Sequence, residues 1–457
     1  MNATTATQPG TIERKFSETF AELQRLYAEA VELFPSGVTH DSRFMLPFPV
    51  YVERGEGSHK WDVQGHELID WWSGHGALLL GHAHPDVVAA VQKQMAAQTH
   101  PGASHKLEIQ WAQLVKQLVP SVQRLRFVSS GTEATMMAIR LARTYTGKSK
   151  VLKFHGHFHG WNDLVIQDAN PPYGVPVPGV APGAFERLIS IAPNDAATLE
   201  ATLRSDQDIG CVIIEPTGGH FGEVPIRGPF LHELRRMTEA LGILLIFDEV
   251  VSGFRVHPGG AQGHYGVRPD LTVLAKILAG GLPGACVGGR KDVLELLEIG
   301  QPRERKMPHP GTFNANPLSS AAGITTLRIV QSGEPCRKAN EIGAHLRASL
   351  NELFSQLDLN WIAYGEFSRL KILPDYQGPR PQSGDADFLP YDGDFDKLDP
   401  NPPRHVQHAF RMAMLLNGVD LPGLKCICSA AHTEGDVDQT IDAARNAITM
   451  LREEGLC

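Results

Sequence analysis

A lysine and an aspartate each follow an apolar run in this 457-residue chain. Lys276 comes directly after the run Leu271 to Ala275, and Asp248 after the run Ile243 to Phe247. Such runs predict buried parallel strands, whose carboxyl ends meet at the edge of an open sheet where ligands bind. A lysine amine forms a Schiff base with an aldehyde, and a carboxylate keeps a pyridine nitrogen protonated. The pair points to a pyridoxal 5′-phosphate (PLP) site, although a solvated lysine and a helix-capping aspartate give the same local pattern.

The segment Ser129 to Glu133 supplies a candidate phosphate site. It follows the strand-like run Leu125 to Val128 and opens a helical pattern that includes Met136 and Leu141. The start of a helix offers free backbone NH groups and the positive end of a dipole to an anion. The alternative interpretation is a capping box between Ser130 and Glu133 without any ligand.

Two further segments fit the same cofactor. The run Phe154 to Trp161 can place an aromatic ring over a flat cofactor, and Gly311 with Thr312 offers another hydroxyl and NH for phosphate. His155, His157 and His159 alternate within the first of these segments and would share one face of a strand. No acidic or cysteine ligand stands nearby, so we predict no metal site there.

The order of these motifs resembles the class III (fold type I) PLP-dependent aminotransferases, from about Phe34 to the C-terminus. The motifs that carry the resemblance are SSGTEA, HGHFHG, IIEP, FDEVVSGFR, LAKILAGGLPGACVGGR and HPGTFNANP. The resemblance implies that Lys276 is the Schiff-base lysine and proton shuttle, and that Asp248 is the partner of the pyridinium nitrogen. It also implies a homodimer whose active site forms at the subunit interface.

The resemblance assigns further residues to the cofactor. Those expected to bind it are Ser130, Gly131 and Thr132 at the phosphate, Phe158 stacked on the ring, Val250 on the other face of the ring, and His159 and Glu215 beside it. Thr312 is expected to reach the phosphate of the neighbouring subunit.

The predicted fold class is α/β, a PLP-dependent transferase fold of type I. From about Lys106 to Gly289, helical patterns alternate with short apolar runs, which indicates a mostly parallel sheet flanked by helices. We expect an N-terminal helix and segment over 1–80 that contributes to the small domain and the dimer interface, a large PLP-binding domain over 81–332, and a smaller α+β domain over 333–457. The acidic, Pro- and Gly-rich stretch from Pro374 to Arg404 predicts a long surface loop.

Composition narrows the class of protein further. The hydrophobic content is 42% and the formal net charge is −9, with scattered basic residues, so nucleic acid and anionic membranes are not expected partners. The polar N-terminus has no signal-peptide pattern, and no apolar run reaches membrane-spanning length. Six cysteines without paired zinc spacing predict neither disulfides nor a metal. A cytoplasmic enzyme that acts on small amino acids and 2-oxo acids is the simplest expectation.

Substrate choice depends on a few pocket positions. Glutamate-1-semialdehyde aminomutases look very similar overall, yet this chain departs from their usual motifs at Gly37 to Arg43, at Ser73 to Gly76 and at Gly219 to Phe221. The departures look closer to D-phenylglycine-type aminotransferases and, more loosely, to those acting on aromatic β-amino acids. Arg43 is the natural bidentate partner of a substrate carboxylate, with an ordinary surface ion pair as the alternative. His40, His75 and His220 are expected to shape the substrate cavity, with a purely structural role as the alternative. Between Leu421 and His432 only Lys425 is cationic, so both half-reactions are expected to share one carboxylate site.

Three functions remain open at this point. The first is a transaminase that moves an amino group from a carboxylate-bearing amino acid, of the D-phenylglycine or aromatic β type, to an acceptor such as 2-oxoglutarate, with Lys276 as acid and base. The second is glutamate-1-semialdehyde 2,1-aminomutase, and the third is a catalytically silent regulatory protein of the same fold. Intact Lys276 and Asp248 argue against the third, and the lack of a G-x-G-x-x-G motif argues against a dehydrogenase.

Overall fold

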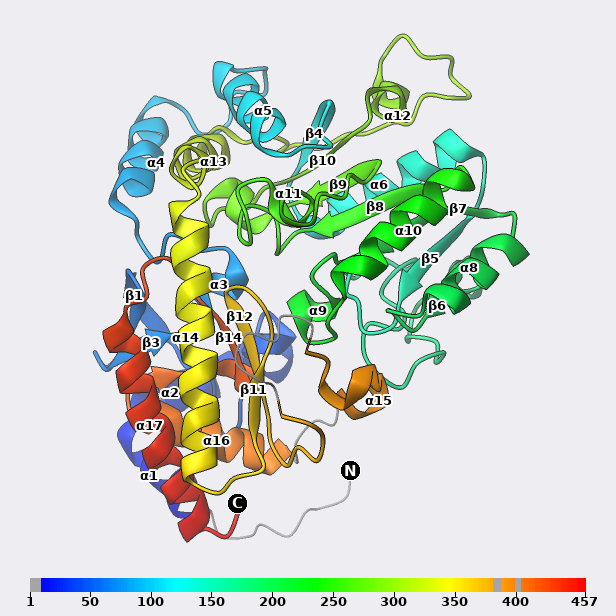
Figure 1. The fold of residues 1–457 in the computed structure, drawn as a ribbon. Helices are drawn as coiled ribbons and strands as arrows, with labels where there is room; N and C mark the ends of the chain where they lie inside the picture. The colour runs from blue at the N-terminus through cyan, green and yellow to red at the C-terminus, as the bar shows by residue number, and fades with distance from the viewer. Residues whose placement is uncertain (1–9, 381–387, 399–403) are drawn as a thin grey trace.

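The structure is a computed structural model, and it describes residues 10–380, 388–398 and 404–457. Figure 1 shows one sheet with its flanking helices at the upper right, and a second group of strands and helices at the lower left, which contains the first and last described helices, α1 (Thr11–Thr19) and α17 (Glu434–Glu453). The long helix α14 (Glu334–Gln356) extends from the first group into the second.

A seven-stranded sheet forms the first group, in the order β4-β10-β9-β8-β7-β5-β6. Its strands are β4 (Arg124–Val128), β10 (Ala285–Gly289), β9 (Leu271–Leu274), β8 (Leu244–Glu249), β7 (Ile209–Ile214), β5 (Lys150–Phe154) and β6 (Leu188–Ile191). Only β10 runs antiparallel to its neighbours. The predicted α/β fold with a mostly parallel sheet is therefore confirmed.

Helices cover both faces of this sheet, which explains why its central strands read as continuous apolar runs. Cys211 and Ile213 of β7 pack on the face of α6 (Gly131–Thr146). The alternate residues Val212 and Ile214 pack on the opposite face, against α8 (Ala196–Ser205) and α10 (Gly228–Ala240). The alternation of side chains along a strand thus fills two separate cores.

The second group combines both ends of the chain around one apolar core. Phe16, Trp71, Trp361 and Leu451 share this core. Its strands form two sheets, β1-β2-β3-β13 and β11-β12-β14. The elements are α1 (Thr11–Thr19), α2 (Ala21–Leu33), β1 (Val52–Glu56), β2 (His59–Asp62), β3 (Glu67–Asp70), β11 (Ile362–Tyr364), β12 (Arg369–Leu373), α16 (Arg404–Leu416), β13 (Val419–Asp420), β14 (Lys425–Ile427) and α17 (Glu434–Glu453).

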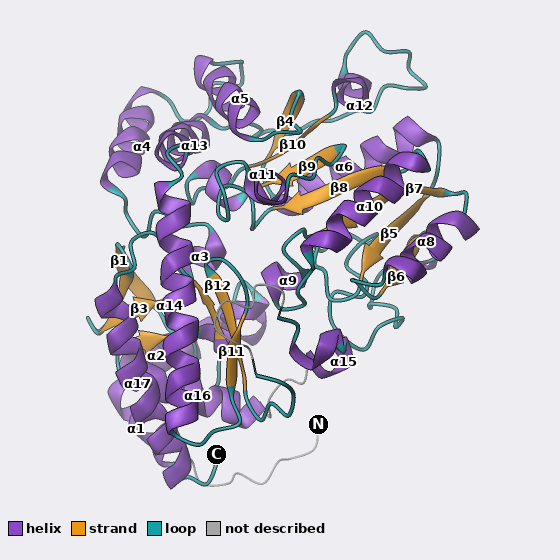
Figure 2. Cartoon of the chain, viewed as in Figure 1, coloured by secondary structure: helices purple, strands orange, loops and turns teal. Residues whose placement is uncertain are grey.

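The remaining elements are short or connect the two groups (Figure 2). They are η1 (Pro35–Gly37), η2 (Asp41–Arg43), α3 (Ser73–Gly76), α4 (Pro85–Ala97), α5 (Lys106–Leu118), α7 (Pro182–Phe185), α9 (Gly219–Gly222), α11 (Gly260–Tyr265), η3 (Lys276–Ala279), α12 (Lys291–Leu294), η4 (Glu295–Leu297), α13 (Pro317–Val330), η5 (Pro390–Gly393), α15 (Phe395–Leu398) and η6 (Pro422–Leu424). Within the described ranges, no helix combines the length and apolar character needed to cross a membrane.

Local details differ from the sequence expectations. The single N-terminal helix expected from its apolar spacing is two helices, because Phe20 leaves the helical conformation with ψ of 41° and buries its ring beside Phe16. The expected loop from Pro374 to Arg404 contains η5 and α15, and the remainder of it lies partly outside the described residues. The domain boundaries after residues 80 and 332 stay a prediction.

Candidate active site

The ends of two neighbouring strands bring Asp248 and Lys276 to one edge of the sheet. Strands β8 and β9 pair in parallel, with Asp248 opposite Val273. Lys276 follows β9 and begins η3 with a φ of 52°, a left-handed backbone that is uncommon for a residue with a side chain. Such backbone strain clusters at functional sites.

The environment of Lys276 favours its neutral amine. Burial lowers the pKa of Lys276, the charges of Asp248 and Glu215 oppose that shift, and the guanidinium of Arg255 adds to it. In the described part of the chain, no ion pair or hydrogen bond to Nζ of Lys276 is found. A neutral lysine amine is the form that attacks a carbonyl carbon.

Asp248 is buried at the end of β8 and is held by two donors. Its Oδ2 lies 2.8 Å from Nδ1 of His159, and its Oδ1 accepts from the backbone NH of Val250 at 3.1 Å. Burial raises the pKa of Asp248 to about 7, against the smaller opposing effects of the Val250 backbone NH and of the charge of Lys276. Because burial also lowers the pKa of His159 well below its usual value, a neutral His159 donates Nδ1–H to the carboxylate. A buried carboxylate with so few partners suits a cationic ligand such as a protonated pyridine nitrogen.

The N-terminus of α6 lies against the same edge of the sheet. A Cβ on Gly131 would stand only 3.0 Å from Cγ2 of Val250 and 3.8 Å from Cβ of Ala275, so the helix start packs closely against the residues that follow β8 and β9. Ser130 caps the helix by accepting from the backbone NH of Glu133 at 3.3 Å, which matches the capping interpretation. Within the described ranges, the NH groups of Gly131 and Thr132 have no hydrogen-bond acceptor, so the cap leaves them available to an anion.

The loop after β5 and the end of β7 form another wall. The backbone NH groups of Phe158 and His220 both donate to Oε1 of Glu215, at 2.7 and 3.0 Å. The rings of Phe158 and His220 are stacked with centroids 6.1 Å apart, and Nε2–H of His220 donates to the carbonyl of Ala169 at 2.9 Å. Phe158 is 43% exposed, so its ring is available to a ligand.

The N-terminal segment contributes Arg43 and His75. Ser42 Oγ lies 2.9 Å from Nδ1 of His40 and 3.0 Å from Nε2 of His75, and Arg43 donates to Oγ1 of Thr39 at 2.8 Å. Burial lowers the pKa of His75 to about 4, and the nearby His40, Arg43 and Lys276 add to the shift. His75 is thus a neutral side chain within electrostatic reach of Lys276.

Thr312 is exposed in the loop before α13. The expected contact of Thr312 with the cofactor phosphate of a neighbouring subunit stays a prediction. The other predicted residues of this chain converge at the edge of the sheet or at the N-terminal segment that faces it.

Sequence reasoning gave Arg255 no role, although the residue stands in one of the quoted motifs. Its guanidinium is fully buried and donates to the carbonyls of Gly76 and Cys428, both at 2.7 Å, and to Oγ of Ser368 at 3.2 Å. Burial lowers the pKa of Arg255 to about 10. The residue ties the N-terminal segment and the C-terminal part to the sheet while it places a positive charge near Lys276.

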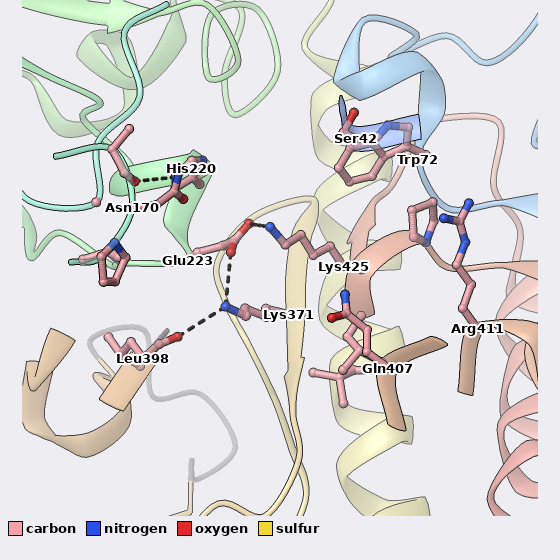
Figure 3. A pocket seen from close by; sticks show the side chains of 18 of the residues that line it. Ser42, Trp72, Asn170, His220, Glu223, Lys371, Leu398, Gln407, Arg411 and Lys425 are labelled. Atoms are coloured by element: carbon pink, nitrogen blue, oxygen red, sulfur yellow. Dashed lines mark hydrogen bonds and ion pairs between the residues drawn. The ribbon is translucent and has the colours of Figure 1, made fainter. Parts of the chain in front are cut away.

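A cavity of about 380 Å³ opens beside His220. Figure 3 shows Glu223 between Lys371 and Lys425 on its wall. Nζ of Lys425 lies 2.6 Å from Oε1 of Glu223 and Nζ of Lys371 lies 3.2 Å from Oε2, while Arg369 also bonds Oε1. Sequence reasoning missed Glu223 and Lys371. The available signal was the i, i+2 spacing of Arg369 and Lys371, which places both on one face of a strand.

Comparison with known proteins identifies the class. The family model described as aminotransferase class-III matches residues 41–360, and the chain belongs to this family. It is an enzyme of this class, as the resemblance implied.

Named relatives and solved structures narrow the comparison. A glutamate-1-semialdehyde 2,1-aminomutase from Methanocella arvoryzae is 37% identical over 439 residues, covering 94% of this chain and 98% of the relative. One from Roseiflexus castenholzii is 41% identical over 446 residues, covering 94% and 97%. An omega-transaminase from Sphaerobacter thermophilus superposes with a TM-score of 0.86 at 31% identity, covering 97% of this chain and 100% of that one.

These relatives correct one expectation. The aminotransferase of D-phenylglycine or aromatic β type is wrong as the main function, because relatives that share 37% and 41% of residues along nearly the whole chain are named glutamate-1-semialdehyde 2,1-aminomutase. The error came from giving three short pocket segments more weight than the chain as a whole. The resemblance to class III and to its aminomutase-like subgroup is confirmed.

The cofactor is PLP. A solved transaminase with PLP bound superposes with a TM-score of 0.85 at 28% identity, covering 96% of this chain and 99% of that one, and class III aminotransferases use this cofactor. The buried Asp248, the Lys276 amine with its lowered pKa and the free NH groups at the start of α6 fit its pyridine nitrogen, aldehyde and phosphate.

Proposed function

We propose that this protein is a glutamate-1-semialdehyde-type 2,1-aminomutase, which moves an amino group from C2 to C1 of one substrate molecule. The observation that carries the proposal is the 37% identity to such an aminomutase over 94% of this chain and 98% of the relative. The alternative of a silent regulatory protein is disfavoured by the intact Lys276, Asp248 and helix N-terminus.

Bound PLP supplies an electron sink that stabilises negative charge on the substrate carbon. Lys276 would bind the cofactor through Nζ, and the same Nζ would accept a proton from the substrate carbon that bears the amino group and later donate a proton back. This role requires an amine that is neutral near pH 7, which the lowered pKa of Lys276 favours.

Asp248 holds the proton on the pyridine nitrogen, and His159 orients its carboxylate through the 2.8 Å contact. A cation placed against Asp248 lowers the pKa of this carboxyl again and keeps it ionised. Ser130, Gly131 and Thr132 would hold the phosphate, and Phe158 and Val250 would pack on the ring. Glu215 orders the loop that carries Phe158.

Arg43 binds the substrate carboxylate, because a guanidinium pairs with it bidentately. His75, neutral at physiological pH, and His220 line the space between this carboxylate and Lys276. Ser42 fixes the orientation of the His75 ring at 3.0 Å.

The active form is proposed to be a homodimer in which Thr312 serves the phosphate of the other subunit. Exposed aromatic rings support this, since Trp161 is 77% and Phe313 58% exposed in the single chain and such surfaces favour association.

Cytoplasm is the proposed compartment, supported by six cysteines without a disulfide. The division into the domain segments 1–80, 81–332 and 333–457 is proposed from the sequence patterns alone.

The test supplies glutamate-1-semialdehyde to the purified, PLP-loaded protein without any amino acid or 2-oxo acid. We expect the protein to convert this substrate into 5-amino-4-oxopentanoate, and chromatography of the product measures the conversion. The variant Lys276→Ala should give no conversion. Turnover that strictly requires a separate 2-oxo acid acceptor would contradict an intramolecular reaction. Gel filtration with light scattering checks the dimer.

A further inference from the structure

A serine hydroxyl joins two histidines of the N-terminal segment. Ser42 Oγ lies 2.9 Å from Nδ1 of His40 and 3.0 Å from Nε2 of His75, and the centroids of the two imidazole rings are 5.1 Å apart. The backbone NH of Ser42 also donates to Nδ1 of His40, at 3.1 Å. Because this nitrogen accepts from a backbone NH, it carries no proton of its own.

These contacts fix the direction of each hydrogen bond among the three side chains. A serine hydroxyl has one proton, and since Nδ1 of His40 can only accept, the Ser42 hydroxyl donates its proton to that nitrogen. The oxygen of Ser42 is then the acceptor toward His75, so Nε2 of His75 is the protonated ring nitrogen. The hydrogen-bond network thereby assigns the tautomer of His75, and in a neutral ring Nδ1 keeps its lone pair.

The surroundings of His75 keep its ring neutral. Burial lowers the pKa of His75 to about 4, and the charges of His40, Arg43 and Lys276 add to the shift, against a smaller opposing effect of Asp70. Arg43 and Lys276 therefore both lie within electrostatic range of this ring. Within the described ranges, Nδ1 of His75 has no hydrogen-bond partner. Because His75 is only half-buried, this lone pair is available to the hydrogen-bond donor of a ligand.

The position of the His75 ring is fixed from two further directions. Trp72 meets the ring edge-on, with centroids 5.3 Å apart. The backbone of His75 has a φ of 59°, a left-handed conformation that is uncommon outside glycine and clusters at functional sites. Ser42 and Trp72 lie on the same side of the cavity beside His220 (Figure 3), so the two residues that hold the ring border this cavity.

We propose that Ser42 and His40 are positioning residues that hold His75 as the tautomer protonated at Nε2, and that Nδ1 of His75 accepts a hydrogen bond from the amino group of the substrate. The inference rests on the proposed function and deepens it, since it names the substrate feature that His75 recognises. A site built around such an acceptor discriminates against an analogue that lacks the donor, because the acceptor then stays unpaired.

The experiment compares the binding of two unreactive monocarboxylates to the PLP-loaded protein by titration calorimetry. 4-Hydroxypentanoate carries a donor on the carbon that bears the amino group in glutamate-1-semialdehyde, and 4-methylpentanoate carries a methyl group there. The ratio of the two affinities is expected to fall about fivefold in His75→Phe, the size of one hydrogen bond. Ser42→Ala should also lower the ratio, whereas Ser42→Thr retains a hydroxyl and should keep the ratio of wild type.

A second measurement needs no ligand. Nitrogen NMR of the PLP-loaded protein with isotopically labelled histidine should show His75 protonated at Nε2 and unprotonated at Nδ1 near neutral pH, with His75→Phe assigning the signal. Ser205→Ala is the matched control for both measurements and should behave as wild type, because Ser205 is exposed at the end of α8 and its hydroxyl donates to the carbonyl of Thr202 at 3.0 Å.

Two results overturn the inference. One is a His75 ring protonated at Nδ1, and the other is an affinity ratio that His75→Phe leaves unchanged. If His75→Phe does not fold, equal ratios in Ser42→Ala and Ser42→Thr overturn it instead. Failure of the isomerisation assay alone overturns the proposed function and leaves the tautomer and the affinity ratio intact.

Discussion

Two groups of buried charges, one at Lys276 and Asp248 and the other around Glu223, have environments that act on them in opposite ways. Beside Lys276, burial dominates, raising the pKa of Asp248 to about 7 and lowering that of Lys276. Around Glu223, three cations overcome the effect of burial and hold the pKa of its carboxyl well below the usual value. The first environment suits groups that exchange protons, and the second keeps the Glu223 carboxyl ionised.

The largest effect is expected for Lys276→Ala, which removes the proton-transferring amine. Aminomutase turnover should fall by at least about a thousandfold, because covalent binding and acid–base catalysis are lost together. The thermal unfolding midpoint of the cofactor-free protein should change little. Retention of full turnover would refute the assignment of Lys276.

In the second group, Glu223→Ala leaves buried cations without their shared carboxylate. The expected loss is about 3 to 5 kcal/mol of unfolding free energy, as for other broken buried ion pairs, measured by urea denaturation. Lys397→Ala on the surface provides the control and should leave the denaturation midpoint unchanged. Equal effects of the two substitutions would mean that the charges around Glu223 are not fixed by burial.

Asp248→Asn tests, through the pH dependence of stability, whether burial acts on the group around Lys276 as described. Since the pKa of Asp248 is raised from 3.8 to about 7 in the folded state, the folded protein holds a proton that the unfolded chain releases between these values. Stability of the cofactor-free wild type should therefore fall as pH rises from about 4 to about 7, by a few kcal/mol from this group. The asparagine variant should lack this component when urea midpoints are compared across the range. An identical pH profile for both proteins would show that Asp248 is not buried in the way described.

The smallest effect concerns Arg255, which adds a positive charge to the surroundings of Lys276. Arg255→Met should raise the pKa of Lys276, while Arg255→Lys should keep it low because the charge remains. The measurement is the pH dependence of Lys276 modification by an amine-reactive reagent in the cofactor-free protein, with peptide mapping. A downward shift in the methionine variant would contradict the electrostatic role.

Local sequence patterns were sufficient to predict the fold class and to predict that several candidate residues lie close together. Strands buried on both faces are apolar throughout, so the runs before Asp248 and Lys276 identified β8 and β9 and placed both residues at one edge. The start of α6 was marked by Ser130 and Glu133. The assignment to D-phenylglycine-type chemistry failed, because substrate choice depends on how distant segments combine in the pocket.

The sequence by itself determined the parallel sheet, the class and the edge at which Lys276, Asp248 and the start of α6 meet, because these depend on periodicity and on short-range caps. Only the tertiary structure decided that Arg255 binds Gly76, Ser368 and Cys428, and that Glu223 meets Arg369, Lys371 and Lys425. Such contacts join segments far apart in the chain, and a residue type alone does not specify its long-range partner. The pKa shifts follow from the same contacts, since burial and neighbouring charges exist only once the chain has folded.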